Sequence, residues 1–172
     1  MVQELIDLKQ SIVEGRYQDA LKIVDELEGM GKQAILRNIE SYLIRLLIHL
    51  VKNQVEKRLT NSWAASITDS VRQIKKLNLK DNQKSYYLKQ DEWLEYLEEA
   101  IEVAILEASI EVGGGIYTPI QLEEIVNKRQ IVEVASFLID LTYKHPAKEL
   151  LSIIRASFSD LPGGQEWLER RI

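Results

Sequence analysis

Glycine and proline divide this chain into segments whose apolar residues recur at helical spacing. The chain has 172 residues but only 8 glycines and 3 prolines. Between the breaks, apolar residues return every three or four positions, which is the period of an amphipathic helix. No long segment alternates between apolar and polar residues as a strand does. The pattern predicts an all-α bundle of six to eight helices. The breaks fall at residues 15, 29–31, 113–115, 119, 146 and 162–164.

Local signals place the ends of the expected helices. Gly29 and Gly31 are expected to end a helix, because glycine adopts the left-handed cap conformation without penalty. Residues 32–58 form the longest and most apolar segment, which predicts the central helix of the bundle. Thr118 and Pro119 have the spacing of a capping box with proline at the first helical position. The expected helices are residues 2–13, 17–28, 32–58, 63–77, 86–112, 119–127, 130–143 and 146–158.

Length and composition favour one helical domain over residues 1–172, since domains typically have about 100–200 residues. The absence of cysteine excludes disulfides, thiolate metal sites and cysteine nucleophiles. The first residues do not have the basic start and unbroken apolar stretch of a secretory signal. No apolar run approaches the roughly 20 residues that span a bilayer. We therefore expect a cytoplasmic protein without a membrane contact.

A group of glutamates on the expected helix 86–112 comes closest to a catalytic pattern. Half of the paired acidic motif with which some helical hydrolases bind Mg²⁺ is supplied by Glu95, Glu98, Glu99 and Glu102. His49 could join them, although a histidine on so apolar a helix is more simply a core-edge residue. The P-loop, the serine-hydrolase elbow and the Glu-x-x-His pairs of di-iron bundles are absent. We predict no catalytic residue and no cofactor, with a metal-dependent hydrolase as the alternative.

Charge is distributed unevenly along the chain. Between residues 45 and 89, which we call the basic segment, the acids are only Glu56, Asp69 and Asp81, and the bases are Arg45, Lys52, Lys57, Arg58, Arg72, Lys75, Lys76, Lys80, Lys84 and Lys89. Between residues 90 and 127, which we call the acidic segment, there is no base. Its acids are Asp91, Glu92, Glu95, Glu98, Glu99, Glu102, Glu107, Glu111, Glu123 and Glu124.

This polarity has several interpretations. The expected helices 63–77 and 86–112 would be antiparallel neighbours, so the two charge sets could face each other in exposed pairs worth about 0–1 kcal/mol each. Alternatively, the acidic helix meets a basic partner or a second copy of the chain. Nucleic-acid binding by the basic segment is a further alternative. It is disfavoured because the acidic helix would repel phosphate and the net charge is −5.

Aromatic and cationic residues gather near the turn between these two helices. Tyrosine, tryptophan and arginine are favoured at the centres of protein interfaces. A partner surface is therefore predicted, although such residues also close the end of a core. The residues of this predicted surface are Arg58, Trp63, Tyr87 and Trp93.

Several short segments occur in an order and spacing that resemble a known family. They are Glu14–Tyr17, Glu26–Lys32, Leu46–Lys52, Arg58, Ser62–Trp63, Glu107–Ser109 and Tyr117–Ile125. Together they resemble an uncharacterised bacterial family, common in cyanobacteria and catalogued as domain of unknown function twenty-nine. The resemblance covers about residues 1–127 and implies a compact helical bundle of unknown activity, with no established site residue. Residues 128–172 are expected to form a helical extension packed on that bundle.

The functional expectation follows from the missing catalytic motifs and the polarised charge. We expect a protein that acts through protein–protein contacts in a small assembly, by binding a protein partner or by self-association. An enzymatic role is not expected, and no small-molecule substrate is identified.

Overall fold

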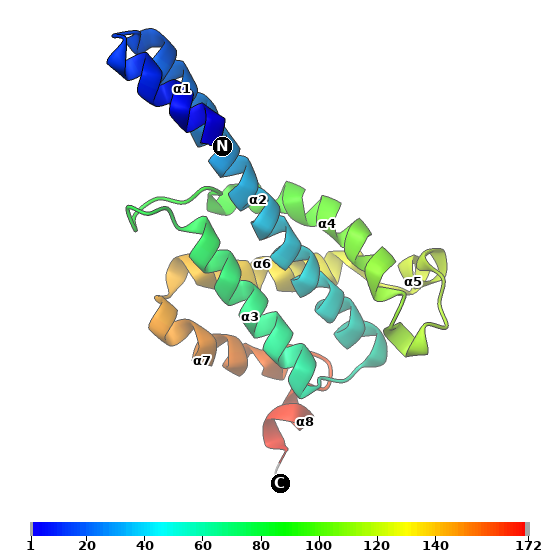
Figure 1. The fold of residues 1–172 in the computed structure, drawn as a ribbon. Helices are drawn as coiled ribbons and strands as arrows, with labels where there is room; N and C mark the ends of the chain where they lie inside the picture. The colour runs from blue at the N-terminus through cyan, green and yellow to red at the C-terminus, as the bar shows by residue number, and fades with distance from the viewer. Residues whose placement is uncertain (1, 171–172) are drawn as a thin grey trace. The chain divides into compact units, whose positions relative to one another are not determined.

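The computed structural model describes residues 2–170, most of which are α-helical (Figure 1). These residues contain no β-strand, only an isolated antiparallel bridge between Leu79 and Tyr86. The predicted all-α bundle is confirmed. Among the described helices, none has a stretch of sufficient length and hydropathy to span a bilayer. The helices are α1 (Val2–Val13), α2 (Tyr17–Glu56), α3 (Asn61–Asn78), α4 (Trp93–Ala108), α5 (Pro119–Ile125), α6 (Lys128–Lys144), α7 (Ala147–Ser157) and α8 (Gly164–Glu169).

The chain forms two compact units, Met1–Asn38 and Ile39–Ile172. We call them the N-terminal unit and the C-terminal unit. Their boundary falls inside α2, so this helix contributes residues to both. A single domain over residues 1–172 stays a prediction.

The N-terminal unit is a pair of helices, α1 and the first part of α2, joined by a tight turn. Gly15 makes the turn with a φ of 72°, a left-handed conformation that glycine adopts without steric cost. Arg16 binds Glu14 within the turn (Nε to Oε2, 2.7 Å). Among the described residues of this unit, only Ser11 and Ala20 are buried. The unit therefore has almost no apolar core of its own.

The C-terminal unit is built around α6, which contacts α3, α4 and α7. In Figure 1 the second half of α2 passes between α3 and α4. Segments on both sides of residue 127 supply the core, since α6 and α7 bury side chains beside those of α2, α3 and α4. The largest fully buried side chains are Ile39, Leu43, Leu46, Leu47, Ile67, Ile74, Leu97, Leu122, Leu138, Ile139, Leu150 and Phe158.

The structure corrects the predicted break at Gly29 and Gly31. One helix, α2, runs from Tyr17 to Glu56, so the long helix begins well before residue 32. Neither glycine has a positive φ, and a β-carbon at either position would meet open space. A glycine inside a helix costs only about 1 kcal/mol relative to alanine. No proline lies nearby to add to that cost, and the helix continues through both positions.

The structure also shortens the predicted helix 86–112 to α4, which begins at Trp93 and ends at Ala108. The residues just before α4 are held in another conformation by hydrogen bonds to the end of α3. Tyr86 forms the isolated bridge with Leu79, and a 3-10 turn then leads into α4. The helix ends at Ala108, before the glycines that were expected to end it, and the positive φ values at residues 113–115 belong to the turn that follows.

Capping side chains start three helices of the C-terminal unit. Thr60 accepts a hydrogen bond from the backbone N–H of Trp63 (3.1 Å) and begins α3. Thr118 and Gln121 form the predicted capping box of α5, with bonds of 3.2 and 3.0 Å. Asn127 caps α6 by accepting from the N–H of Gln130 (3.2 Å). The capping box is thus as predicted.

Candidate functional site

The glutamates singled out in the sequence lie on the outer face of α4. Glu95 and Glu99 are one helical turn apart and line a shallow, open hollow of about 230 Å³ with Tyr96. Glu98 is exposed beside them. Carboxylates on so open a surface are surrounded by water, which screens their charges from each other.

Glu102, the fourth glutamate, is engaged by a lysine from α6. The ammonium group of Lys128 binds Glu102 (2.7 Å) and Glu123 (2.6 Å), and these two carboxylates raise the pKa of Lys128. The bridge joins α4 and α5 to the first residue of α6. Glu102 therefore has a structural partner that the sequence did not indicate.

His49 lies on α2 and is half-buried. Its Nδ1 donates a hydrogen bond to the backbone carbonyl of Arg45 (2.8 Å), which leaves Nε2 as the acceptor in the neutral ring. Burial lowers the pKa of His49 below 6.5; the Arg45 carbonyl opposes this shift, and the positive charges of Lys52 and Arg45 add to it. These contacts are those of a neutral histidine at the edge of a core.

The five candidate metal ligands do not converge. Within the part of the chain that the structure describes, no three histidine, aspartate or glutamate side chains are placed to hold one metal ion. Glu95 and Glu99 face solvent together, whereas Glu102 binds Lys128 and His49 binds a backbone carbonyl.

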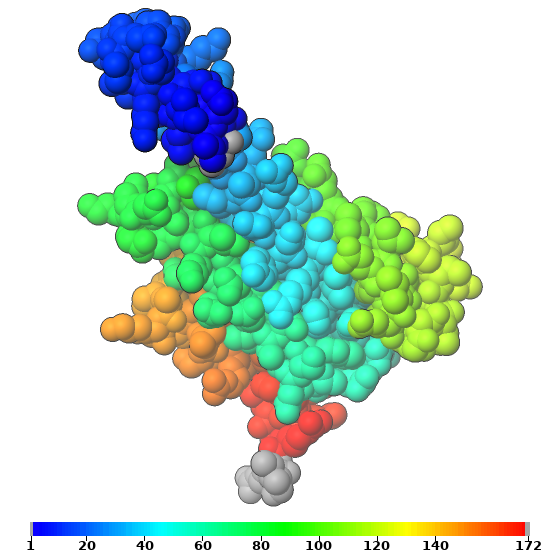
Figure 2. All heavy atoms as spheres, viewed as in Figure 1, coloured from blue at the N-terminus to red at the C-terminus, as the bar shows by residue number. Residues whose placement is uncertain are grey.

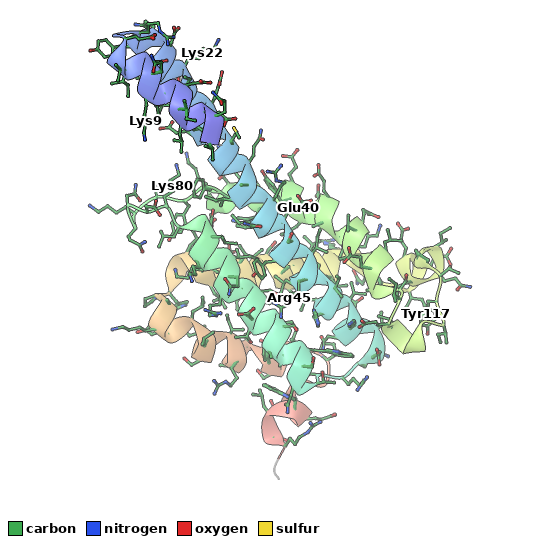
Figure 3. All side chains as sticks on the ribbon, in the orientation of Figure 1. Lys9, Lys22, Glu40, Arg45, Lys80 and Tyr117 are labelled. Atoms are coloured by element: carbon green, nitrogen blue, oxygen red, sulfur yellow. The ribbon has the colours of Figure 1, made fainter. Side chains whose placement is uncertain are left out.

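Much of the basic segment is tied into the C-terminal unit. Arg45, labelled in Figure 3, binds Asp69 of α3 (2.9 Å) where α2 passes that helix. Lys52 is buried and pairs with Glu111, just after α4. Lys75 donates to a backbone carbonyl of α6 (2.5 Å), and burial lowers the pKa of this lysine. These cations act as internal cross-links between helices.

Other bases of this segment contact aromatic rings or neighbouring acids. The guanidinium of Arg58 lies 4.7 Å from the ring centre of Trp63. The ammonium of Lys80 lies 5.3 Å from the ring centre of Tyr87. Arg72 binds Asp69 (2.8 Å). The basic segment is therefore not a free row of cations for a phosphate backbone to follow.

The acidic segment has few such partners. Among the described residues, one ion pair joins it to the basic segment, that of Lys52 with Glu111. The expected pairing of the two charge sets along a hairpin of α3 and α4 is wrong, because α2 passes between these helices (Figure 1). In the described part of the chain no ion pair forms at Asp91, Glu95, Glu98, Glu99, Glu107 or Glu124.

The predicted partner surface is brought together only in part. Arg58 is exposed, and Trp63 and Tyr87 are half-buried beneath their cations. Trp93 is only 3% exposed, and its Nε1 donates to the hydroxyl of Tyr143 (2.6 Å). Trp93 is therefore a core residue, which corrects its assignment to the surface.

Sequence reasoning missed the polar centre beside Trp93. Asn78 is buried at the end of α3, where its Nδ2 donates to the Leu88 carbonyl (3.0 Å) and to the Tyr143 hydroxyl (2.9 Å). Its Oδ1 accepts from the Leu88 N–H (2.7 Å). Burial raises the pKa of Tyr143, whose hydroxyl donates to the Leu88 carbonyl (2.6 Å). An asparagine in the last turn of a helix is a weak signal, because its partners lie far along the chain.

Two exposed apolar surfaces were also missed. In the N-terminal unit the exposed apolar residues are Val2, Leu5, Ile6, Ile12, Val13, Tyr17, Leu21 and Met30. In the C-terminal unit a second set follows the outer face of α4 at Val103 (38%), Leu106 (56%) and Ile110 (75%). Their spacing of three and four residues was a readable signal, since it places them on one face of a helix.

One comparison with known proteins finds a match. The family model described as Domain of unknown function DUF29 matches residues 6–130. No curated protein and no solved structure matches the chain. Because the matched residues make up most of the sequence, this chain belongs to the DUF29 family, as its sequence pattern indicated.

Proposed function

We propose that this member of the DUF29 family acts through protein–protein contacts, and that a second copy of the chain is the partner of its N-terminal unit. One observation carries the proposal. In that unit, large apolar side chains face solvent, while among its described residues only the small side chains of Ser11 and Ala20 are buried. A lone pair of helices without an apolar core is marginal in water, because helical stability comes mostly from packing of an apolar face.

The exposed face of α1 has the spacing of an interface. Leu5 and Ile12 are seven residues apart, as are Ile6 and Val13, so each pair lies on one side of the helix. These four side chains are 45–81% exposed. Leu8, which lies outside both pairs, is half-buried. The apolar ridges of α1 thus point away from its own hairpin.

A second copy is the simplest occupant of this surface. Two helical hairpins that meet face to face form a four-helix arrangement, in which every apolar ridge of one copy is covered by the other. The pairing is symmetric and closed, which is the commonest form of soluble oligomer. Full burial of each apolar side chain contributes about 1.5–3 kcal/mol. Four buried ridge residues per chain can therefore offset the cost of association, which is on the order of 4–15 kcal/mol.

The test measures molar mass by light scattering across a range of concentrations. The wild-type chain is expected to associate, and the double variant Ile6→Glu with Val13→Glu is expected to be a monomer. The matched control is Gln18→Glu with Gln33→Glu, which adds the same charge at exposed polar positions of α2 in the same unit. A wild-type monomer at every concentration, or equal loss of association in the control, overturns the proposal.

Two further measurements separate this proposal from the alternatives that the sequence suggested. Stabilisation by Mg²⁺, Mn²⁺ or Zn²⁺ that disappears in Glu95→Ala and Glu99→Ala would favour a metal-dependent hydrolase instead. Salt-sensitive retention on heparin or DNA would favour nucleic-acid binding by the basic segment. A cytoplasmic location is part of the proposal, supported by the absence of cysteine and tested by cell fractionation.

A further inference from the structure

We propose that the outer face of α4 binds a basic amphipathic helix from another protein. This surface lies in the C-terminal unit, so the proposal goes beyond self-association of the N-terminal unit and does not depend on it. Two properties carry it: exposed apolar residues, and carboxylates on the same face that form no ion pair among the described residues. We call this surface the α4 face, defined by Glu95, Glu99, Val103, Leu106 and Ile110.

The apolar part of the α4 face occupies its C-terminal half. Leu106 is 56% exposed and Val103 38%, and Ile110 continues the spacing just past the end of α4 with 75% exposed. Leucine and isoleucine side chains this exposed gain about 25 cal/mol for each Å² of apolar area that a partner covers. The opposite face of α4 is packed on the core, with Leu97 and Ala104 buried completely. The helix therefore has an apolar face on each side, and only one is covered in the chain.

The acidic part of the α4 face lies one to two turns nearer the N-terminus. Glu95 and Glu99 precede Val103 by eight and four residues, which places them on the same side of the helix. Both are exposed, and among the described residues neither has an ion pair. Figure 2 shows the yellow-green surface of residues near 100 open on the visible side of the C-terminal unit. Together the two halves form a strip of carboxylates that leads into a strip of apolar side chains.

The chemistry of this strip identifies the partner. A helix with apolar residues every three or four positions can cover the apolar half, and lysine or arginine at one of its ends meets Glu95 and Glu99. Complementary charge steers such a helix and fixes its direction. Anionic lipid headgroups and nucleic-acid phosphates are repelled by the same carboxylates. Three bases of this chain, Arg45, Lys52 and Lys75, already bind partners within the C-terminal unit.

The apolar surface extends along the chain beyond α4. Ile116 is 70% exposed, and Ile120 on α5 is 71% exposed. α5 packs against α4. A bound helix longer than the α4 face therefore has further apolar side chains near its end, whereas a short one uses the α4 face alone.

The experiment uses the full chain and a fluorescent peptide of about 15 residues, designed from Leu, Ala and Lys as an amphipathic helix. Its binding is measured by anisotropy at low and high salt. A peptide of the same composition with scrambled order has the charge without the apolar face. A third peptide, with Glu in place of Lys, has the apolar face with the opposite charge. We expect binding of the first peptide only, weakened by salt because the charges are exposed.

Variants then locate the binding site. Glu95→Lys with Glu99→Lys, and separately Leu106→Gln, are each expected to weaken binding by about tenfold or more. The matched controls are Glu133→Lys with Glu149→Lys, which changes net charge equally elsewhere in the C-terminal unit, and Leu151→Gln, an exposed leucine on α7. Hydrogen exchange on the wild-type complex is expected to show added protection in α4.

Each result of these binding experiments either supports or overturns the proposal. Loss of binding in the α4 variants but not in the controls, with α4 protected, supports the proposal. Equal binding of the scrambled peptide, equal loss in the controls, or no binding at all overturns it. Binding of anionic vesicles through the same residues would also overturn it, because it would identify a membrane surface. Repeating the titration with Ile6→Glu and Val13→Glu keeps a failure of self-association separate from a failure of the α4 face.

Discussion

The basic segment, residues 45–89, and the acidic segment, residues 90–127, carry opposite charges in similar density but at different depths of the C-terminal unit. In the basic segment Arg45, Lys52 and Lys75 each bind a partner on another part of the fold. In the acidic segment most carboxylates extend into solvent from α4 and its flanking turns. Charges that cross-link helices contribute to the fold, whereas unpaired charges on a surface are available to a partner.

The depth of a charged side chain determines how much its removal changes the stability of the fold. A cation held inside the unit by a carboxylate or a carbonyl costs stability when its partner is removed, because an uncompensated charge stays buried. An exposed carboxylate costs almost nothing to remove, because water replaces every contact that it makes. Substitutions in the basic segment are therefore expected to affect folding, and substitutions in the acidic segment are expected to affect binding.

The largest effect is expected at the polar centre of the basic segment. Asn78→Ala removes three hydrogen bonds and leaves the Leu88 N–H without its acceptor. Loss of a buried, fully bonded amide is expected to reduce the free energy of unfolding by about 2–4 kcal/mol. Urea denaturation measures this loss, with Glu98→Ala in the acidic segment as the control. Equal stability of the two variants would contradict the comparison.

The second effect tests the one described ion pair that joins the two segments. Glu111→Gln leaves the buried ammonium of Lys52 without its carboxylate. Since Glu111 is itself 67% exposed and water can reach the site, a loss of about 1–2 kcal/mol is expected, less than for a fully buried pair. Lys52→Met removes the buried charge together with its need for a partner. It is expected to cost less than Glu111→Gln in the same denaturation experiment.

The pH dependence of this pair has a definite sign. Lys52 lowers the pKa of Glu111 below 4.5 in the folded chain. The stability contributed by the pair is therefore fully present above pH 4.5 and is lost as pH falls through the folded pKa. In Glu111→Gln this component of the acid sensitivity is expected to disappear. If the free energy of unfolding falls with acid equally in the variant and in the wild type, Lys52 and Glu111 are not coupled in solution.

Local signals in the sequence were enough for part of this fold. The bounds of α1 and the capping box at Thr118 follow from residues within one or two turns of each other. Gly29 and Gly31 were misjudged because a glycine ends a helix only when nearby residues also favour an end. The residues beside these glycines do not show directly whether the helix ends there or continues.

Contacts between distant residues account for what the sequence did not predict. Residues 86–89 have a helical pattern, but the bonds of Asn78 and the bridge from Leu79 to Tyr86 hold them in another conformation. The neighbours of α3 and α4 depend on where α2 passes, which no local pattern encodes. The burial of Trp93 depends in the same way on Tyr143, from another helix. The glutamates of α4 were found from sequence, but only the fold shows that Glu102 binds Lys128 while Glu95 and Glu99 form no ion pair among the described residues.

A smaller effect is expected at His49, on the edge of the basic segment. Its folded pKa is lowered chiefly by burial, so the unfolded chain binds a proton more readily. Stability is therefore expected to fall as pH drops below 6.5 and to level off once the folded histidine also becomes protonated. His49→Gln keeps a hydrogen-bonding side chain and should make the free energy of unfolding less dependent on pH in this range. A curve of unchanged slope would show that another group is responsible.

The smallest effect, and the one of opposite sign, is expected on the α4 face. Glu95 and Glu99 are like charges one turn apart, a spacing at which repulsion costs a helix about 0.2–0.5 kcal/mol. Glu99→Gln removes that repulsion and no described ion pair, so the melting temperature should rise slightly at low salt. The gain should vanish at high salt, where exposed charges are screened. Arg72→Gln in the basic segment removes a contact with Asp69 instead and should be slightly destabilising at low salt. A loss of stability in Glu99→Gln would show that this carboxylate is cross-linked like the bases, and the contrast between the two segments would not hold.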